Sequence, residues 1–235
     1  MNPAGVAAGA AIPVIAVDGP AASGKGTIAS GVATELGFHL LDSGALYRLV
    51  ALTALDAKIA LDAAATLAGA AQRLDVTFAG GRIRMDGRDV TEAIRSEAVS
   101  AAASRVAVHP GVRGALIERQ RAFRRPPGLV ADGRDMGTVV FPDARLKVFL
   151  TASADERASR RYKQLIEKGI SSTIESLLLD IRERDARDAS RAVAPLVPAT
   201  DAVVLDTTDL SIEAVTRILI ERYRALEHMG RPRTL

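Results

Sequence analysis

A glycine-rich turn and one lysine follow an apolar stretch near the beginning of the sequence. Residues 12–17 are apolar and rich in β-branched side chains, which predicts a buried parallel strand, and a helix is expected to begin at Lys25. Between them, Gly19 and Gly24 occupy the glycine positions of the pattern G-x-x-x-x-G-K. Backbone N–H groups converge on an oxyanion only where no side chain intervenes, and a helix N-terminus adds donors and the positive end of its dipole. The turn therefore predicts a phosphate-binding loop; an ordinary glycine-rich turn is the alternative.

The lysine of this pattern and the residues after it indicate which phosphates the loop holds. Lys25 supplies a mobile full charge that can bridge the β- and γ-phosphates of a nucleoside triphosphate. The next residue is usually a serine or threonine whose hydroxyl ligates Mg²⁺, but here it is Gly26, and the hydroxyl comes at Thr27. We therefore expect no direct side-chain ligation of Mg²⁺ at this position.

Charged side chains follow a second apolar stretch, residues 129–132. Asp132 ends this predicted strand, and Arg134 and Asp135 come soon after it. Ligands of open α/β sheets collect at the carboxyl ends of the strands, so these side chains are expected near Lys25. An aspartate that ends such a strand is the usual place for Mg²⁺ or its waters. A turn stabilised by aspartate side chains is the alternative, and it explains one of the two aspartates more readily than both.

The string Asp42-Ser43-Gly44 precedes a predicted helix over residues 45–57. Free N–H groups at the helix start, the Ser43 hydroxyl and Arg48 one turn later would together bind a second anion. Asp42 or Ser43 would equally serve as the helix N-cap. The residues alone leave both interpretations open.

Arginines are concentrated in two predicted helical stretches, residues 154–168 and 171–189. They would either form ion pairs on an exposed helical hairpin or form a mobile lid that closes over a transferring phosphate and expels water. Arginine suits the second role because its planar fork binds phosphate oxygens in pairs. Arginines of the helical stretch 91–125 are instead expected mostly on solvated faces. The arginines of the two stretches and just beyond are Arg157, Arg160, Arg161, Arg182, Arg184, Arg187 and Arg191.

The composition is that of a single globular domain. The 235 residues are 48% hydrophobic but only 3% aromatic, which predicts a core of alanine, leucine and valine. The net charge is only +3, and the sequence has no tryptophan on which bases could stack. A nucleic-acid partner is therefore not expected. The sequence contains no cysteine, which excludes disulfides and zinc–thiolate sites and fits a reducing cytoplasm.

The beginning of the sequence has no sign of an export signal. No basic residue precedes Lys25, so the charged region of a signal peptide is missing, and no apolar run approaches the length of a membrane span. We expect a cytoplasmic protein in which residues 1–11 are a mobile tail rich in alanine and glycine.

Apolar strands that alternate with helical segments predict an α/β fold with a parallel sheet. Residues 75–90 instead predict a β-hairpin around Gly80-Gly81, which we interpret as an insertion into this rhythm. No repeat and no linker divides the chain, so residues 1–235 are expected to form one domain. Besides the two strands above, strands are expected at residues 38–41, 145–150 and 202–205, and a final helix at residues 212–229.

Several separated strings resemble those of one family, the bacterial cytidylate kinases, which are P-loop nucleoside monophosphate kinases. The strings are VDGPAASGKGT, LLDSGALYR, RQRAF, DGRDMGTVVFPDA and RERDARDASRAVAPLVPATDAVVLDTT, and the resemblance extends over residues 13–223. It implies a core of five parallel strands flanked by helices, with an insert that binds the nucleoside monophosphate and a lid. The core would comprise residues 12–56, 126–152 and 186–229, the insert residues 57–125 and the lid residues 153–185.

The resemblance also implies ATP, used with Mg²⁺, and CMP or dCMP as the substrates of an enzyme that we expect to be a monomer. By motif position, the ATP phosphates would contact Gly19, Pro20, Ala21, Ala22, Ser23, Gly24, Lys25, Gly26 and Thr27. The CMP phosphate would contact Ser43, Arg48 and Arg134, the cytosine Ser104, Arg113 and Asp135 with support from Arg191, and the ribose Arg184 and Asp188. Phosphoryl transfer would depend on Lys25, Arg134 and Asp132, with Asp132 near Mg²⁺ either directly or through a water. Beyond the resemblance, we expect Arg157 and Arg161 to act as lid contacts.

Two other functions stay open at this point. A kinase of the same fold that uses UMP or AMP would be favoured if Asp135 did not contact the base. The other is an ATP- or GTP-driven switch without an acceptor. The absence of a guanine-reading N-K-x-D string argues against a switch, as does the GKGT loop, which is typical of nucleoside monophosphate kinases.

Overall fold

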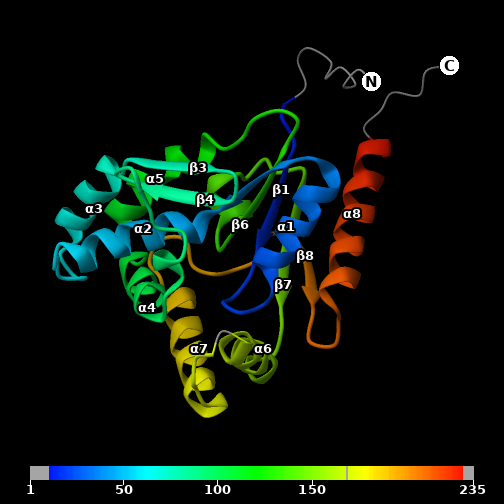
Figure 1. Ribbon diagram of the computed structural model, residues 1–235. Helices are drawn as coiled ribbons and strands as arrows, with labels where there is room; N and C mark the ends of the chain where they lie inside the picture. The colour runs from blue at the N-terminus through cyan, green and yellow to red at the C-terminus, as the bar shows by residue number, and fades with distance from the viewer. Residues whose placement is uncertain (1–10, 168, 230–235) are drawn as a thin grey trace.

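The computed structural model describes residues 11–167 and 169–229, so residues 1–10 of the expected tail lie outside the described residues. Figure 1 shows an open sheet flanked by helices, with a helical hairpin beyond one end of it. The sheet has five parallel strands in the order β2-β6-β1-β7-β8, which confirms the predicted α/β fold. Its strands are β1 (Val14–Asp18), β2 (His39–Asp42), β6 (Leu129–Gly133), β7 (Leu146–Thr151) and β8 (Val203–Asp206).

The central strand β1 is buried along its whole length, as its unbroken apolar pattern predicts. Val14 and Ala16 face a core that includes α2 (Ser43–Asp56), whereas Ile15 and Val17 face a second core. The second core is closed by α1 (Lys25–Leu36) and α8 (Ile212–Met229), which pack against each other. Helices therefore cover both faces of the sheet and leave the ends of the strands for ligands.

Capping residues fix the end of α1 and the start of α2, the two helices next to the phosphate-binding loop. α1 ends at Gly37, whose left-handed backbone (φ 67°) lets its N–H donate to the carbonyls of Ala33 and Thr34. α2 is capped by Asp42, whose carboxylate accepts from the N–H of Ala45 at 3.1 Å. This confirms the capping interpretation for Asp42.

The stretch predicted as helical over residues 91–125 divides into three pieces. A 3₁₀ turn over Ala93–Arg95 is followed by α4 (Glu97–Val106) and α5 (Pro110–Arg121). The two helices are separate because Pro110 can begin a helix but cannot continue one. α4 packs on α2, and α5 packs on α3 (Ala64–Arg73).

Among the described residues, none of the helices combines the length and the apolar composition needed to cross a bilayer.

A small antiparallel sheet interrupts the α/β alternation where the hairpin was predicted. It contains β3 (Val76–Ala79), β4 (Arg82–Met85) and β5 (Arg88–Asp89), in that order. The second turn, at Asp86-Gly87, has positive φ at both residues, which is the geometry of a tight hairpin. The third strand was not predicted.

The arginine-rich stretches form a hairpin of two helices, α6 (Ala154–Glu167) and α7 (Ile174–Ala189). It has a small apolar cluster of its own, built on Ala158, Leu165, Leu177 and Ile181. In Figure 1 the hairpin lies beyond the end of the sheet at which β1 leads into α1. This position brings two of its arginines, Arg157 and Arg160, into contact with the phosphate-binding loop.

Gly19→Ala and Gly37→Ala separate a packing constraint from a backbone constraint. A Cβ on Gly19 (φ 152°) would lie 2.2 Å from the carbonyl oxygen of Leu150, whereas a Cβ on Gly37 would have no described atom within 4 Å. Gly37→Ala should cost about 1–2 kcal/mol of unfolding free energy, the strain of a left-handed residue. Gly19→Ala should cost more than about 3 kcal/mol, because overpacking against fixed backbone adds to the strain. Urea unfolding measures both, and equal losses would contradict this account.

Candidate active site

The phosphate-binding loop folds back on itself between β1 and α1. Gly24 is the left-handed N-cap of α1 (φ 82°). The carbonyl oxygen of Pro20 accepts from the Ser23 hydroxyl at 3.1 Å and from Lys25 Nζ at 3.3 Å. The loop thus curls around the lysine, with the first N–H groups of α1 free of helical partners.

Lys25 is buried beside Asp132, with Nζ 3.8 Å from Oδ1. Burial and the charge of Arg134 together lower the pKa of Lys25 to about 8, against the attraction of Asp132. Burial likewise raises the pKa of Asp132. Asp132 Oδ1 is buried and has no hydrogen-bond partner among the described residues. The lysine is therefore placed in an environment that an additional anion would stabilise.

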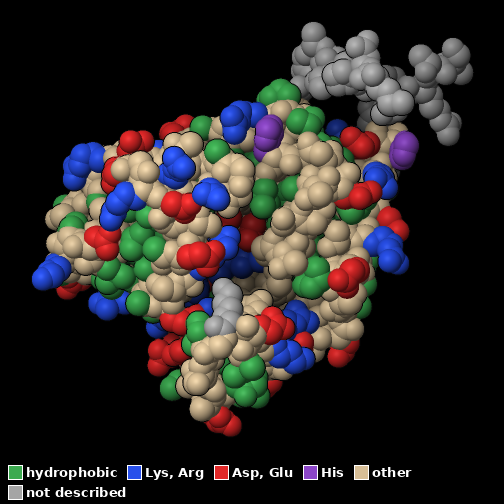
Figure 2. Space-filling model, in the orientation of Figure 1, with side chains coloured by type: hydrophobic (Ala, Val, Ile, Leu, Met, Phe, Trp, Pro, Cys, Tyr) green, Lys and Arg blue, Asp and Glu red, His purple; other side chains and the backbone are tan. Residues whose placement is uncertain are grey.

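A cavity of about 690 Å³ opens at this point, between the loop, the ends of β2 and β6, α4 and the α6–α7 hairpin. Figure 2 shows it as a hollow that contains acidic and basic side chains. The predicted site residues that line it are Ala21, Ala22, Gly24, Lys25, Gly26, Thr27, Ser43, Arg48, Ser104, Arg113, Asp132, Arg134, Asp135, Arg161, Arg184, Asp188 and Arg191. Gly19, Pro20, Ser23 and Arg157 lie outside this lining.

Arginines converge on the cavity with donors still free. The Nε atoms of Arg48, Arg184 and Arg191 are buried and have no partner among the described residues. Burial and the neighbouring charge of Arg134 together lower the pKa of Arg184 to about 10. Unpaired buried donors on like charges are costly, so the arrangement is suited to bind a polyanion.

Asp188 holds two of these arginines. It is almost fully buried, and its carboxylate accepts from Arg134 Nε at 3.1 Å and from Arg191 Nη2. Burial alone would raise the pKa of Asp188, but the charges of Arg134 and Arg191 outweigh burial and hold the pKa below its usual value. Asp188 therefore stays ionised and positions both guanidinium groups.

Asp135 and Arg113 form a second buried pair in the cavity lining. Arg113 Nη2 donates to Asp135 Oδ2, and Nη1 donates to the carbonyl oxygen of Ala107 at 3.3 Å. The guanidinium also lies 5.6 Å from the centre of the Tyr47 ring. Burial raises the pKa of Tyr47 to about 12, so the ring stays neutral. Tyr47 was not among the predicted site residues.

Asp18, the last residue of β1, was also missed. Its Oδ1 accepts from the N–H of Met136 and its Oδ2 from the N–H of Gly137, both at 2.8 Å. Burial, with a smaller contribution from the charge of Asp135, raises the pKa of Asp18 to about 6 against these two hydrogen bonds. The only sequence signal was its position directly before Gly19, which is equally common for a turn aspartate.

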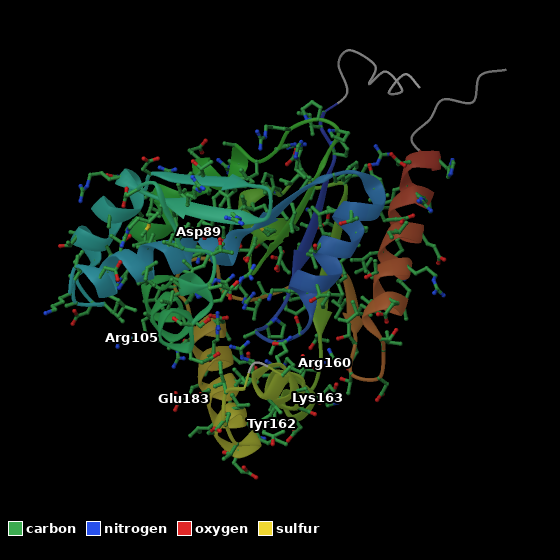
Figure 3. The ribbon with its side chains drawn as sticks, viewed as in Figure 1. Asp89, Arg105, Arg160, Tyr162, Lys163 and Glu183 are labelled. Atoms are coloured by element: carbon green, nitrogen blue, oxygen red, sulfur yellow. The ribbon has the colours of Figure 1, made fainter. Side chains whose placement is uncertain are left out.

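Arg157 and Arg160 tie α6 to the phosphate-binding loop instead of lining the cavity. Arg157 donates to both carboxylate oxygens of Asp185 (3.0 and 2.6 Å) and to the carbonyl oxygen of Ala21 (3.2 Å). Arg160 donates to the carbonyl oxygen of Ser23 at 3.4 Å, and Figure 3 shows its position on α6. The phosphate contact predicted for Arg157 would require these hydrogen bonds to break.

Arg161 does line the cavity and reaches across its opening. Its Nη2 donates to Glu97 of α4, so α6 is joined to the helix on the opposite side. A second link joins Arg187 of α7 to Ser104 of α4, at 3.4 Å. The hairpin in this structure is therefore connected to both sides of the cavity.

The residues present fit a nucleotide-bound Mg²⁺ better than a metal held by protein alone. No group of three His, Cys, Asp or Glu that could hold a metal occurs within residues 11–167 and 169–229. One unpartnered carboxylate oxygen, Asp132 Oδ1, does face the region of Lys25. Mg²⁺ favours such an oxygen and usually keeps waters and phosphates as its other ligands.

Comparison with known proteins identifies the family. A model of the cytidylate kinase family matches residues 15–225, which is most of the chain. The chain belongs to the cytidylate kinase family. This confirms the resemblance from which the roles of the site residues were derived.

Similar proteins agree with this membership. The cytidylate kinase of Bordetella bronchiseptica is 59% identical over 219 residues, which cover 93% of this chain and 98% of that protein. The cytidylate kinase of Paraburkholderia phymatum is 59% identical over 214 residues, which cover 91% and 94%. A solved gluconokinase of Sinorhizobium meliloti 1021 is 16% identical with a TM-score of 0.46, over 93% of this chain and 95% of its own. The last likeness is too distant to add to the assignment.

Arg48→Met and Arg105→Met test whether the free guanidinium donors bind an anion. Arg48 lines the cavity, whereas Arg105 is an exposed arginine on the outer side of α4, as Figure 3 shows. Arg48→Met should weaken the binding of inorganic pyrophosphate about tenfold, because charge-assisted hydrogen bonds contribute about 1.5–3 kcal/mol. Arg105→Met should leave the affinity within about twofold. Isothermal titration calorimetry measures both, and an equal effect of the two variants would contradict the anion-binding role.

Proposed function

We propose that this protein transfers the γ-phosphate of ATP to CMP or dCMP, giving ADP and CDP or dCDP. The observation that carries the proposal is that a phosphate-binding loop, a buried Asp–Arg pair and further arginines line one cavity. Family membership independently supports the same reaction. The UMP, AMP and acceptor-free alternatives have no specific observation in their favour.

The reaction requires charge neutralisation more than covalent chemistry. A phosphate oxygen of CMP attacks the γ-phosphorus of ATP in line, and a phosphate monoester is already an anion, so no general base is needed. Lys25 neutralises charge on the donor phosphates, while Ser43, Arg48 and Arg134 bind the acceptor phosphate. Because Lys25 and Asp132 are buried, their charges act in a medium less polar than water.

Base selection is assigned to the Asp135–Arg113 pair. Cytosine presents a donor at N4 where uracil presents an acceptor at O4. The carboxylate of Asp135, held by Arg113, accepts from the cytosine amino group and repels the uracil oxygen. A site built around a hydrogen bond can reject the wrong partner by about 10⁴-fold, because the mismatch leaves buried polar groups unpaired.

Fewer residues are assigned to the ribose and to Mg²⁺. Arg184 and Asp188 are assigned to the ribose, and dCMP is accepted because its other contacts compensate for a missing 2′-hydroxyl. Asp132 would hold Mg²⁺ that arrives with ATP, directly or through a water, and the metal would supply positive charge to the phosphates. The unpartnered Oδ1 of Asp132 supports this assignment.

The remaining expectations are part of the same proposal. Residues 57–125 act as the insert that binds the monophosphate, and residues 153–185 act as a lid. The enzyme works as a monomer in the cytoplasm, in pyrimidine nucleotide metabolism, without a nucleic-acid partner. The contacts of Arg161 with Glu97 and of Arg187 with Ser104 support a lid that closes on the insert.

Acceptor specificity is the direct test of the proposed reaction. ADP formation from ATP·Mg²⁺ is measured with CMP, dCMP, UMP, AMP and no acceptor. Rapid formation with CMP and dCMP and little with UMP or AMP is expected. Asp135→Asn should lower the CMP:UMP ratio of kcat/KM at least about tenfold, because an amide can also donate to O4. Glu183→Gln, an exposed change on the outer side of α7 (Figure 3), should leave the ratio unchanged. ADP release without acceptor would contradict the proposal.

Lys25→Ala tests the charge-neutralising role. The substitution should lower kcat by about 10³-fold, because a charge aimed at the transferring group is lost. The affinity for CMP should change little, since Lys25 belongs to the donor loop. Steady-state kinetics and equilibrium binding of CMP measure the two effects. Near-normal turnover would refute the role.

A further inference from the structure

The side chain of Asp18 joins the strand before the phosphate-binding loop to the turn after Asp135, by accepting hydrogen bonds from backbone N–H groups. It directly precedes Gly19, the first residue of the phosphate-binding loop. Each of its carboxylate oxygens accepts one N–H, from Met136 and Gly137, and these residues directly follow Asp135. One side chain therefore fixes the turn that carries Asp135 to the strand that carries the donor loop.

Within the turn, the N–H groups of Val139 and Val140 donate to the carbonyl oxygen of Asp135, which leaves the first two N–H groups of the turn for another acceptor. Asp135 has an irregular backbone (φ −143°, ψ 25°) and leads into a short π-helical turn over Met136–Val140. Asp18 accepts the N–H groups of the first two residues of that turn, which have no partner within it. A Cβ on Gly137 would lie 3.4 Å from Asp18 Oδ2, so the backbone approaches the carboxylate closely.

Only an aspartate supplies what this position requires. Two adjacent N–H donors need two acceptors on one short side chain, and an ionised carboxylate offers both. Asparagine offers one acceptor, and its amide N–H₂ opposes the second donor. The carboxylate is nonetheless unfavourable here, since it is buried near Asp132 and Asp135. A side chain that is kept at such a cost is expected where its exact hydrogen bonds matter.

We propose that Asp18 is a positioning residue for acceptor selection: it holds Asp135 at the place where the base of CMP is recognised. This inference rests on the proposed function and adds to it a residue that does not itself touch the substrate. Loss of the Asp18 contacts lets the Asp135 turn move relative to the donor loop. Binding of the acceptor and its discrimination then suffer, whereas binding of ATP does not.

Asp18→Asn and Asp89→Asn form the matched pair for the test. Asp89, on the small sheet (Figure 3), accepts from the N–H and the hydroxyl of Thr91 but lies outside the cavity lining. Asp18→Asn should raise KM for CMP about tenfold and lower the CMP:UMP ratio of kcat/KM about tenfold, the effect of one lost buried hydrogen bond. KM for ATP should stay within about twofold. Asp89→Asn should change none of these values.

Three outcomes are decisive. A rise in KM for CMP with a loss of discrimination supports the positioning role. Unchanged KM and discrimination in Asp18→Asn overturn it, and so does an equal loss for ATP and CMP, which would mean a role in the donor loop alone. If Asp18→Asn does not fold, Gly137→Pro removes one of the two N–H donors instead and is judged by the same criteria. Wild-type protein that forms no ADP with CMP would refute the proposed function itself, a result distinct from any of these.

Discussion

Buried carboxylates hold the cationic side chains of the cavity in place, and the rest of the site depends on these pairs. Asp132 lies beside Lys25, Asp135 binds Arg113, and Asp188 binds Arg134 and Arg191. Without them, like charges would repel one another inside a partly dry cavity. With them, the positive groups are fixed, while several of their donors have no partner in the part of the chain that the structure describes. Such a site is prepared for a polyanionic ligand before the ligand arrives.

The parallel sheet brings aspartates from distant parts of the chain to one edge, next to the cavity. Asp42 of β2 is paired in register with Asp132 of β6, and Asp18 of β1 is paired with Gly133. Parallel strands end at the same edge of the sheet, so the helices and turns that follow them all begin beside the cavity. The close approach of the elements there is shown by Gly133, where a Cβ would lie 2.7 Å from the Ser43 hydroxyl. The geometry of the site is thus a consequence of strand order.

Some of this arrangement could be predicted from sequence and some could not. The loop of Gly19 and Gly24 was predictable because its backbone geometry admits few other residues, and the five strands were predictable from their apolar runs. Asp18 was missed because the apolar run ends at Val17 and one aspartate has no periodicity. β5 was missed because a strand of two residues shows no alternation. The pairing of Arg157 with Asp185 depends on how two helices pack, which spacing along one helix does not determine.

The central claim is that donor and acceptor phosphates meet in one cavity, between the loop of Lys25 and the arginines around Asp188. An adenosine and a cytidine joined 5′ to 5′ by a chain of phosphates would span both halves of that cavity. Inhibition of ADP formation by this compound is measured while ATP and CMP are varied in turn. The account predicts that inhibition is competitive with ATP and also competitive with CMP. Competition with only one of the two substrates would contradict it, because the two phosphates would then occupy separate sites.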